Sequence, residues 1–195
     1  MNKFVSLLAC GLLAFGLGCS KERAQNNTQT QPSSNPSATD QSVTTNAQSA
    51  ALNADDRAFV EKAAVGGKAE VELGQLAQEK AQNEQVKQFA QRMVTDHSQA
   101  NSELLSMGDK MQLSLPTALD KEHQDLKNKL SNLNGAKFDN EYMKAMVDDH
   151  QKDLQEFENA AGSAVNSDVK SFASKTSAVI RQHLDLAKSI ESSLK

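Results

Sequence analysis

Residues 54–195 predict an all-α fold, a four-helix bundle with one short extra connecting helix. Apolar residues recur through this region at spacings of three and four, which places them on one face of successive helices. Helix breakers are scarce, since the 195-residue chain has 9 Gly and 3 Pro and only Pro116 lies within the region. Aromatic residues make up 4% of the chain, which is too few to predict a β-sandwich.

The first predicted helix begins at Asn53 and ends near Gln82. Asn53 is a suitable N-cap, and Asp55 and Asp56 follow it in the first turn, where the helix dipole favours negative charge. Three glycines lie inside this helix, and each costs about 1 kcal/mol relative to alanine. Close packing on a neighbouring helix, or a bend, would explain them. The three are Gly66, Gly67 and Gly74.

A second long helix and a connector follow. The second long helix is predicted over residues 84–111, and Pro116 prevents it from continuing. The connector, residues 117–133, is short and very polar, and Asn134-Gly135 closes it.

The last two long helices are predicted over residues 138–161 and 168–194. Each has an apolar stripe, so four amphipathic helices can share one core. The similar segments Met93–His97 and Met146–His150 favour a pseudo-symmetric pair of helical hairpins.

Each long helix carries one titratable residue within its apolar stripe. The spacing to neighbouring apolar residues places all four on the buried side. At 1.5 Å per residue, each lies about 20–25 Å from the turn of its hairpin, so the four are level whichever way the connector leads. The sequence therefore predicts one buried cluster. Its members are Glu70, His97, His150 and His183.

This cluster is a competent ligand set for one transition-metal ion. Neutral imidazoles and a carboxylate bind Zn²⁺, Fe²⁺, Mn²⁺ or Cu²⁺, and an uncompensated buried carboxylate would be costly. Met93 and Met146, one turn before two of the histidines, are weaker candidates as copper ligands, because methionine at helical spacing is more often part of a core. The alternative is a non-catalytic envelope or stress-associated interaction module. In that alternative, ionised Glu70 and a protonated histidine form a hydrogen-bonded layer that fixes the helix register.

Neighbouring polar residues carry less specific signals. Asp96 and Asp149 precede two of the histidines and can reach only a histidine on another helix, so we expect either that role or solvated charges. Asp120 and His123 are expected on the surface. The sequence contains no nucleophile-and-base set and no glycine-rich phosphate loop, so no catalytic residue is assigned. The net charge of −4 does not predict nucleic-acid binding.

Residues 1–18 predict a signal peptide. Lys3 precedes an apolar stretch that is too short to span a membrane, and small residues precede Cys19. The run Gly16–Ser20 resembles a bacterial lipoprotein signal, which implies lipid attachment at Cys19, sorting to the outer membrane and a membrane as partner. An ordinary cleaved signal on a soluble periplasmic protein is the alternative. Residues 19–53, rich in Gln, Asn, Ser and Thr, predict a disordered tether.

A series of motifs extends over nearly all of residues 54–195. They are Asp56-x-x-Phe59, Ala63-Ala64-x-Gly66-Gly67-x-x-Glu70-Val71, Val86-Lys87-x-Phe89-Ala90, Met93-Val94-x-Asp96-His97, Leu115-Pro116, Gly135-x-x-Phe138-Asp139-x-x-Tyr142, His150 and His183-Leu184. The series resembles the domain-of-unknown-function family 4142. The resemblance implies a ferritin-like bundle in an exported outer-membrane protein, and it implies no settled activity.

The resemblance to ferritin-like proteins does not extend to a di-iron centre. Di-iron members carry Glu-x-x-His on two helices, whereas Val94, Val147 and Ile180 stand three residues before the histidines of the cluster. One carboxylate is also too few to bridge two irons. A mononuclear site is therefore the metal site that the sequence predicts.

Overall fold

The computed structural model describes residues 52–194, and within them the chain folds into five α-helices and no strand. The helices are α1 (Ala54–Lys80), α2 (Glu84–Lys110), α3 (Lys121–Ser131), α4 (Gly135–Ser163) and α5 (Ser167–Ser193). The predicted all-α bundle with a short connecting helix is confirmed. The predicted signal peptide, residues 1–18, and nearly all of the predicted tether, residues 19–53, lie outside the described residues.

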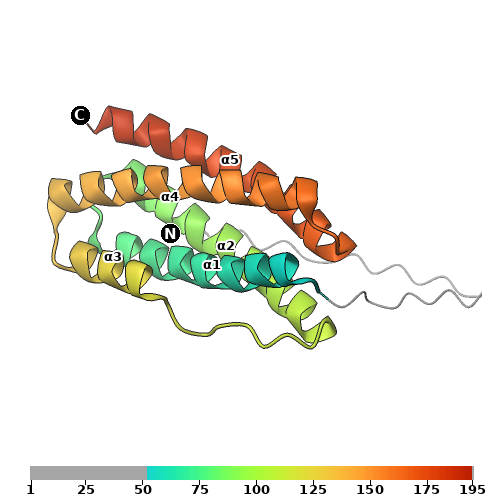
Figure 1. Cartoon of the computed structure of the whole chain (residues 1–195). Helices are drawn as coiled ribbons and strands as arrows, with labels where there is room; N and C mark the ends of the chain where they lie inside the picture. The colour runs from blue at the N-terminus through green and yellow to red at the C-terminus, as the bar shows by residue number, and fades with distance from the viewer. Residues whose placement is uncertain (1–51, 195) are drawn as a thin grey trace, which may run out of the picture. The chain divides into compact units, whose positions relative to one another are not determined.

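The four long helices form the bundle, and one crossover links its two hairpins (Figure 1). One antiparallel hairpin consists of α1 and α2, and the other consists of α4 and α5. After α2 the chain runs back along the length of the bundle and passes through α3 before α4 begins. As a result, α4 runs antiparallel to α1 and parallel to α2. A single long crossover connection is the topology of ferritin-like bundles.

The ends of α1 follow the sequence prediction closely. The Asn53 side chain caps α1 by accepting the Asp56 N–H at 2.7 Å. The helix ends at Lys80, two residues before the predicted end, and Asn83 then caps α2.

The connecting helix is shorter than predicted. Its predicted start, Thr117, is wrong, because α3 begins at Lys121. Asp120 is the N-cap: its carboxylate accepts the His123 N–H at 2.9 Å, a bond that aspartate makes at helix starts. Gly135, with φ of +62°, separates α3 from α4 as expected, but α4 begins at this residue rather than three residues later.

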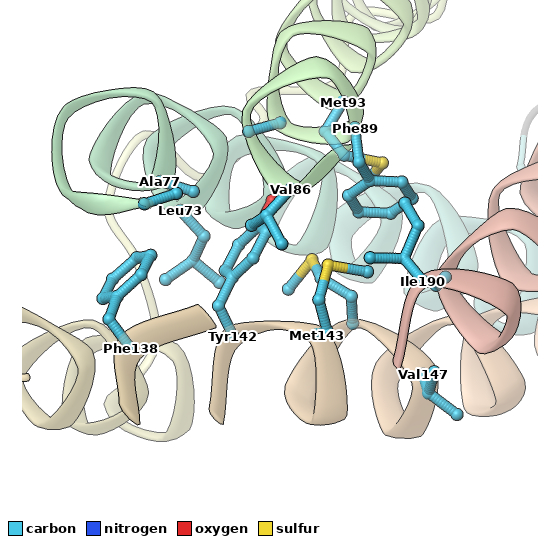
Figure 2. Close-up of a cluster of buried hydrophobic side chains, with 14 of the residues drawn as sticks. Leu73, Ala77, Val86, Phe89, Met93, Phe138, Tyr142, Met143, Val147 and Ile190 are labelled. Carbon is cyan, nitrogen blue, oxygen red and sulfur yellow. The ribbon is translucent and has the colours of Figure 1, made fainter. Parts of the chain in front are cut away.

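Two apolar clusters fill the bundle on either side of its middle. The first lies toward the α1–α2 turn and contains side chains from all four long helices (Figure 2). The second lies toward the α4–α5 turn. On α2, His97 falls between Met93 of the first cluster and Leu104 of the second. The polar residues of the other long helices fall at the same level, so the bundle has a polar layer between two apolar ones.

Two of the three α1 glycines permit close packing. A Cβ at Gly67 would lie 2.1 Å from Asn101 Oδ1, and a Cβ at Gly74 would lie 2.9 Å from Val94 Cγ2. A Cβ at Gly66 would meet nothing within 4 Å. Close packing, one of the two predicted explanations, therefore accounts for Gly67 and Gly74 and does not account for Gly66.

Two buried aspartates each bind the turn of the opposite hairpin. On α4, Asp139 accepts the backbone N–H groups of residues 82 and 83 at 3.1 and 2.9 Å. On α1, Asp56 accepts those of residues 165 and 166 at 3.3 and 2.7 Å. We call Asp56 and Asp139 the aspartate latches. Asp56 was expected only as a first-turn charge, whereas its carboxylate joins the two hairpins.

An internal repeat relates the α1–α2 hairpin to the α4–α5 hairpin. The segments that carry it are Ala81-x-Asn83-x-x-Val86-Lys87-x-Phe89-Ala90 and Ala164-x-Asn166-x-x-Val169-Lys170-x-Phe172-Ala173. They are separated by 83 residues, as are the two aspartate latches. The shorter similarity between Met93–His97 and Met146–His150 relates α2 to α4, which are not equivalent helices of this repeat. The two hairpins are thus related in a different register from the one predicted.

Candidate metal centre

Three histidine rings meet in the polar layer at the middle of the bundle. His97 comes from α2, His150 from α4 and His183 from α5, and their exposed fractions are 7%, 0% and 0%. The ring centroids are 5.4 to 5.8 Å apart. One nitrogen of each ring lies within 4.8 Å of a nitrogen of the other two. The predicted level of the three histidines is therefore observed.

Hydrogen bonds fix the tautomers of two rings. His150 Nδ1 lies 2.9 Å from the Met146 carbonyl oxygen, so Nδ1 carries the proton and donates. His183 Nε2 lies 2.8 Å from Asp96 Oδ2 and donates to that carboxylate. The other nitrogens, His150 Nε2 and His183 Nδ1, consequently carry no proton, and each has a lone pair that can accept a hydrogen bond or bind a metal ion. Both are buried without a hydrogen-bond partner among the described residues, as is His97 Nε2.

The three imidazoles are held in the neutral form. Burial lowers the pKa of His150 to about 4, and the nearby His183 contributes to the shift. Burial and the other two rings hold the pKa of His97 well below its ordinary value. Burial also lowers the pKa of His183, against the opposing effect of Asp96. Neutral imidazole is the form that coordinates a metal ion.

Glu70 lies in the same layer, beside the Nδ1 edge of the His150 ring. Its side chain is buried, and Oε1 lies 3.7 Å from His150 Nδ1, the nitrogen already bound to Met146. Its oxygens instead group with those of Asp149 and Asp153, all within 4.8 Å of one another. The structure thus brings the four predicted residues together and divides them into a three-histidine group and an acidic group.

The pKa shifts do not favour the charges that the alternative interpretation, an interaction module with a structural Glu/His layer, requires. That alternative pairs ionised Glu70 with a protonated histidine in a hydrogen-bonded layer. Burial, and next the charge of Asp149, raise the pKa of Glu70 well above its ordinary value, while the pKa of each histidine is lowered. Among the described residues, the buried side-chain nitrogens and oxygens without a partner belong to Glu70, Tyr142 and the three histidines. Glu70 and each histidine of the layer thus keep at least one buried polar atom without a partner among the described residues.

Comparison with known proteins identifies the family. Residues 41–190 match the sequence model of DUF4142, a domain of unknown function. The chain belongs to this family. No curated protein matches the sequence significantly.

Two solved structures share the DUF4142 fold. A DUF305 fragment from Deinococcus radiodurans has a TM-score of 0.63 and 14% identity, and the match covers 73% of this chain and 97% of that one. A DUF305 protein from Streptomyces coelicolor, described as secreted, also has a TM-score of 0.63 and 14% identity, with coverage of 72% and 92%. At this identity the similarity concerns the fold alone. In residues 52–194 no helix of the DUF4142 protein is long and apolar enough to cross a membrane.

The sequence did not single out all the polar residues around the DUF4142 centre. Asp96 has the neighbouring-helix role that was one of two expectations, because it turns away from His97 and accepts from His183. Asp149 lies in the acidic group rather than beside a histidine nitrogen. Asp153 was missed, although it stands one turn after His150 on the same helix face.

The remaining candidates lie elsewhere. Met93 and Met146 are wholly buried in the first apolar cluster, and their role as copper ligands stays a prediction. On α3, Asp120 Oδ1 contacts His123 Nδ1 at 2.7 Å. This pair lies outside the bundle core, as expected.

Two cavities border the histidines. The larger, of about 150 Å³, lies between α2 and α5 and is lined by Asp96, His97 and His183 among others. The smaller, of about 30 Å³, is lined by Gly67, His97 and Asp153 among others. A small ion therefore has a short route from solvent to the ring of His97.

Proposed function

We propose that this DUF4142 protein binds one transition-metal ion through His97, His150 and His183. Two observations carry the proposal: one ring nitrogen of each of three buried histidines lies within 4.8 Å of a nitrogen of the other two, and each ring has a buried nitrogen without a hydrogen-bond partner among the described residues. A buried polar atom without a partner costs about 1–3 kcal/mol, and one metal ion would satisfy all three.

The surroundings of the rings fit this proposal. Metal-bound histidines usually donate their second N–H to a carboxylate or a carbonyl, which fixes the tautomer and the ring orientation. His183 donates to Asp96 and His150 donates to the Met146 carbonyl. Three imidazoles are a ligand set for Zn²⁺, Cu²⁺ or Fe²⁺, with Mn²⁺ favoured less because it prefers oxygen ligands. A three-histidine shell leaves a coordination position open, but we assign no reaction to it.

Metal analysis of untagged protein tests the proposal. After incubation with Zn²⁺ and removal of excess metal, wild type should retain about one equivalent per chain, and His150→Ala should retain little. His123→Ala is the matched control, because His123 is the one histidine outside the centre. Wild-type protein without metal, or His150→Ala with the wild-type amount, would refute the proposal.

Thermal unfolding separates this proposal from the structural alternative. A ligand that binds only the folded state stabilises it by about 2.7 kcal/mol at 100 times its dissociation constant. Zn²⁺ should therefore raise the melting temperature of wild type, and a chelator should reverse the increase. An interaction module whose polar layer is purely structural would melt at the same temperature under both conditions.

We also propose that a lipid at Cys19 anchors the protein to the outer membrane, facing the periplasm. The lipoprotein-like sequence supports this location, and the similarity to a DUF305 protein described as secreted agrees with export. Cells fed labelled palmitate should incorporate the label into wild type and not into Cys19→Ser. Cys10→Ser is the control and should incorporate label. Unlabelled wild type would indicate the ordinary signal peptide instead.

A further inference from the structure

We infer that Glu70, Asp149 and Asp153 form a second cation site, for a hard divalent ion that prefers oxygen ligands, such as Ca²⁺ or Mn²⁺. One carboxylate oxygen from each residue lies within 4.8 Å of those of the other two. This site is separate from the three-histidine centre and does not depend on it.

Glu70 provides the observation that points to a ligand. Its side chain is wholly buried, and neither carboxylate oxygen has a hydrogen-bond partner among the described residues. Both oxygens lie beside the carboxylates of Asp149 and Asp153, and when no cation is bound a proton shared between Glu70 and Asp149 can take its place. Three carboxylates at this separation repel one another unless a cation or a proton lies between them.

The lysines near the acidic group are engaged elsewhere. Lys62 and Lys152 both contribute charge at Asp153. Lys62 forms an ion pair with Glu156, and Lys152 Nζ lies 3.5 Å from Glu122 Oε1. Their side chains are 71% and 68% exposed, so neither is buried among the three carboxylates. Neither lysine is therefore a buried counter-cation for the three carboxylates.

The carboxylate ligands and their exposure to solvent both favour a hard ion. Carboxylates select Ca²⁺, Mg²⁺ and Mn²⁺, which complete their coordination with water, whereas imidazoles select softer ions. Asp149 and Asp153 are partly exposed, and Asp153 lines the cavity of about 30 Å³ that also reaches Gly66. A small cavity thus reaches Asp153, one of the three carboxylates.

The two sites lie on opposite edges of one imidazole. Glu70 faces Nδ1 of His150, at 3.7 Å, and that nitrogen donates to the Met146 carbonyl. The nitrogen of this ring without a hydrogen-bond partner is Nε2, which we assign to the three-histidine centre. Loss of one site can therefore be measured while the other remains.

Terbium luminescence provides a direct test. Tb³⁺ binds oxygen ligands and emits when a nearby tyrosine absorbs light. The chain has one tyrosine, Tyr142, and no tryptophan. Tyr142 points from α4 into the core, and the charge of Glu70 acts on its hydroxyl (Figure 2). Emission excited through tyrosine therefore reports an ion near the acidic group.

Wild-type protein should give saturable emission with about one Tb³⁺ per chain, and Ca²⁺ should compete. Glu70→Gln should weaken Tb³⁺ binding at least about tenfold, because one of three charged ligands is lost. Asp153→Asn, at the partly exposed rim, should do the same and serves if Glu70→Gln does not fold. Asp148→Asn is the control, since Asp148 pairs with Lys144 at the surface, and it should change binding less than about twofold.

Two results would overturn the inference. One is the absence of saturable emission from wild type, which would mean that protons neutralise the carboxylates. The other is equal Tb³⁺ affinity in wild type and Asp153→Asn. His97→Ala separates the two sites, because it should lose Zn²⁺ and keep terbium emission. Loss of both signals in His97→Ala, with its helicity intact, would contradict independent sites.

Discussion

Asp96→Asn is the substitution that most directly tests how the three-histidine centre is oriented. Asp96 accepts the Nε2–H of His183 at 2.8 Å, and this bond leaves Nδ1 of the ring as the metal-binding atom. Asparagine has the same shape without the charge. Its amide can also present N–H to the ring, which would place the proton on Nδ1 and remove the ligand.

The structure sets the size of the expected effect. Removal of a group that orients a metal ligand typically costs 10- to 100-fold in affinity, or about 1.4–2.8 kcal/mol. The Asp96 side chain is 29% exposed and also lies 3.3 Å from Arg92 Nε, so solvent and a second charge weaken its influence. We therefore expect the lower half of the range, about 10- to 30-fold.

Competition with a chromophoric Zn²⁺ indicator at pH 7 measures this change. Asp148→Asn is the matched control, because it removes one aspartate charge from an exposed position. Nitrogen NMR of the His183 ring gives the tautomer independently. If Asp96→Asn binds Zn²⁺ within about twofold of wild type and remains helical, the carboxylate does not orient the ring and the reasoning fails.

Three other predictions concern proton competition, the α1 glycines and the aspartate latches. The pKa of His150 is lowered to about 4 and those of His97 and His183 are also lowered, so protons compete at His150 only as the pH approaches 4, and a pH series of the indicator assay should find Zn²⁺ still bound at pH 5.5. Gly66→Ala should raise the free energy of unfolding by up to about 1 kcal/mol in urea, whereas Gly74→Ala should lower it, because its Cβ would lie 2.9 Å from Val94 Cγ2 and 3.1 Å from the Ala90 carbonyl oxygen. Asp139→Ala should cost about 1–3 kcal/mol in the same assay, since two backbone N–H groups of the α1–α2 turn lose their acceptor.

The following controls and contradicting results apply to these predictions. Loss of Zn²⁺ already near pH 6.5 would mean that the histidines titrate like exposed ones. Gly162 also has open space at its Cβ, so Gly162→Ala should stabilise as Gly66→Ala does. A common sign for Gly66→Ala and Gly74→Ala would contradict the packing argument. Asp55→Asn, an exposed change beside Asp56, should have less than about 0.5 kcal/mol effect.

The sequence predicted the bundle because long apolar stripes dominate four of its helices. It failed at the start of α3, where apolar periodicity is weak and the boundary depends on one side chain, Asp120. The predicted start of α4 is three residues late, because Gly135, which ends the connector, is itself the first residue of α4. Helix boundaries set by a single capping bond carry little signal in hydrophobic spacing.

The height of the candidate site along the bundle was predictable, but its division into a three-histidine group and an acidic group was not. Distances along antiparallel helices place Glu70 and the three histidines at one height. Spacing does not fix which edge of a ring faces a neighbour, so it could not separate Glu70 from the bare nitrogens. Asp153 could have been found from the 83-residue repeat, in which it is the counterpart of Glu70.

The repeat has a consequence for the small cavity beside His97. The positions 83 residues from His150, His97 and His183 are occupied by Gly67, Ile180 and Ala100. These three residues all line that cavity. The repeat thus pairs the three-histidine group of one half with this cavity in the other half. Glycine and alanine stand at the positions that correspond to His150 and His183, and small side chains at these positions leave room for the cavity that borders His97.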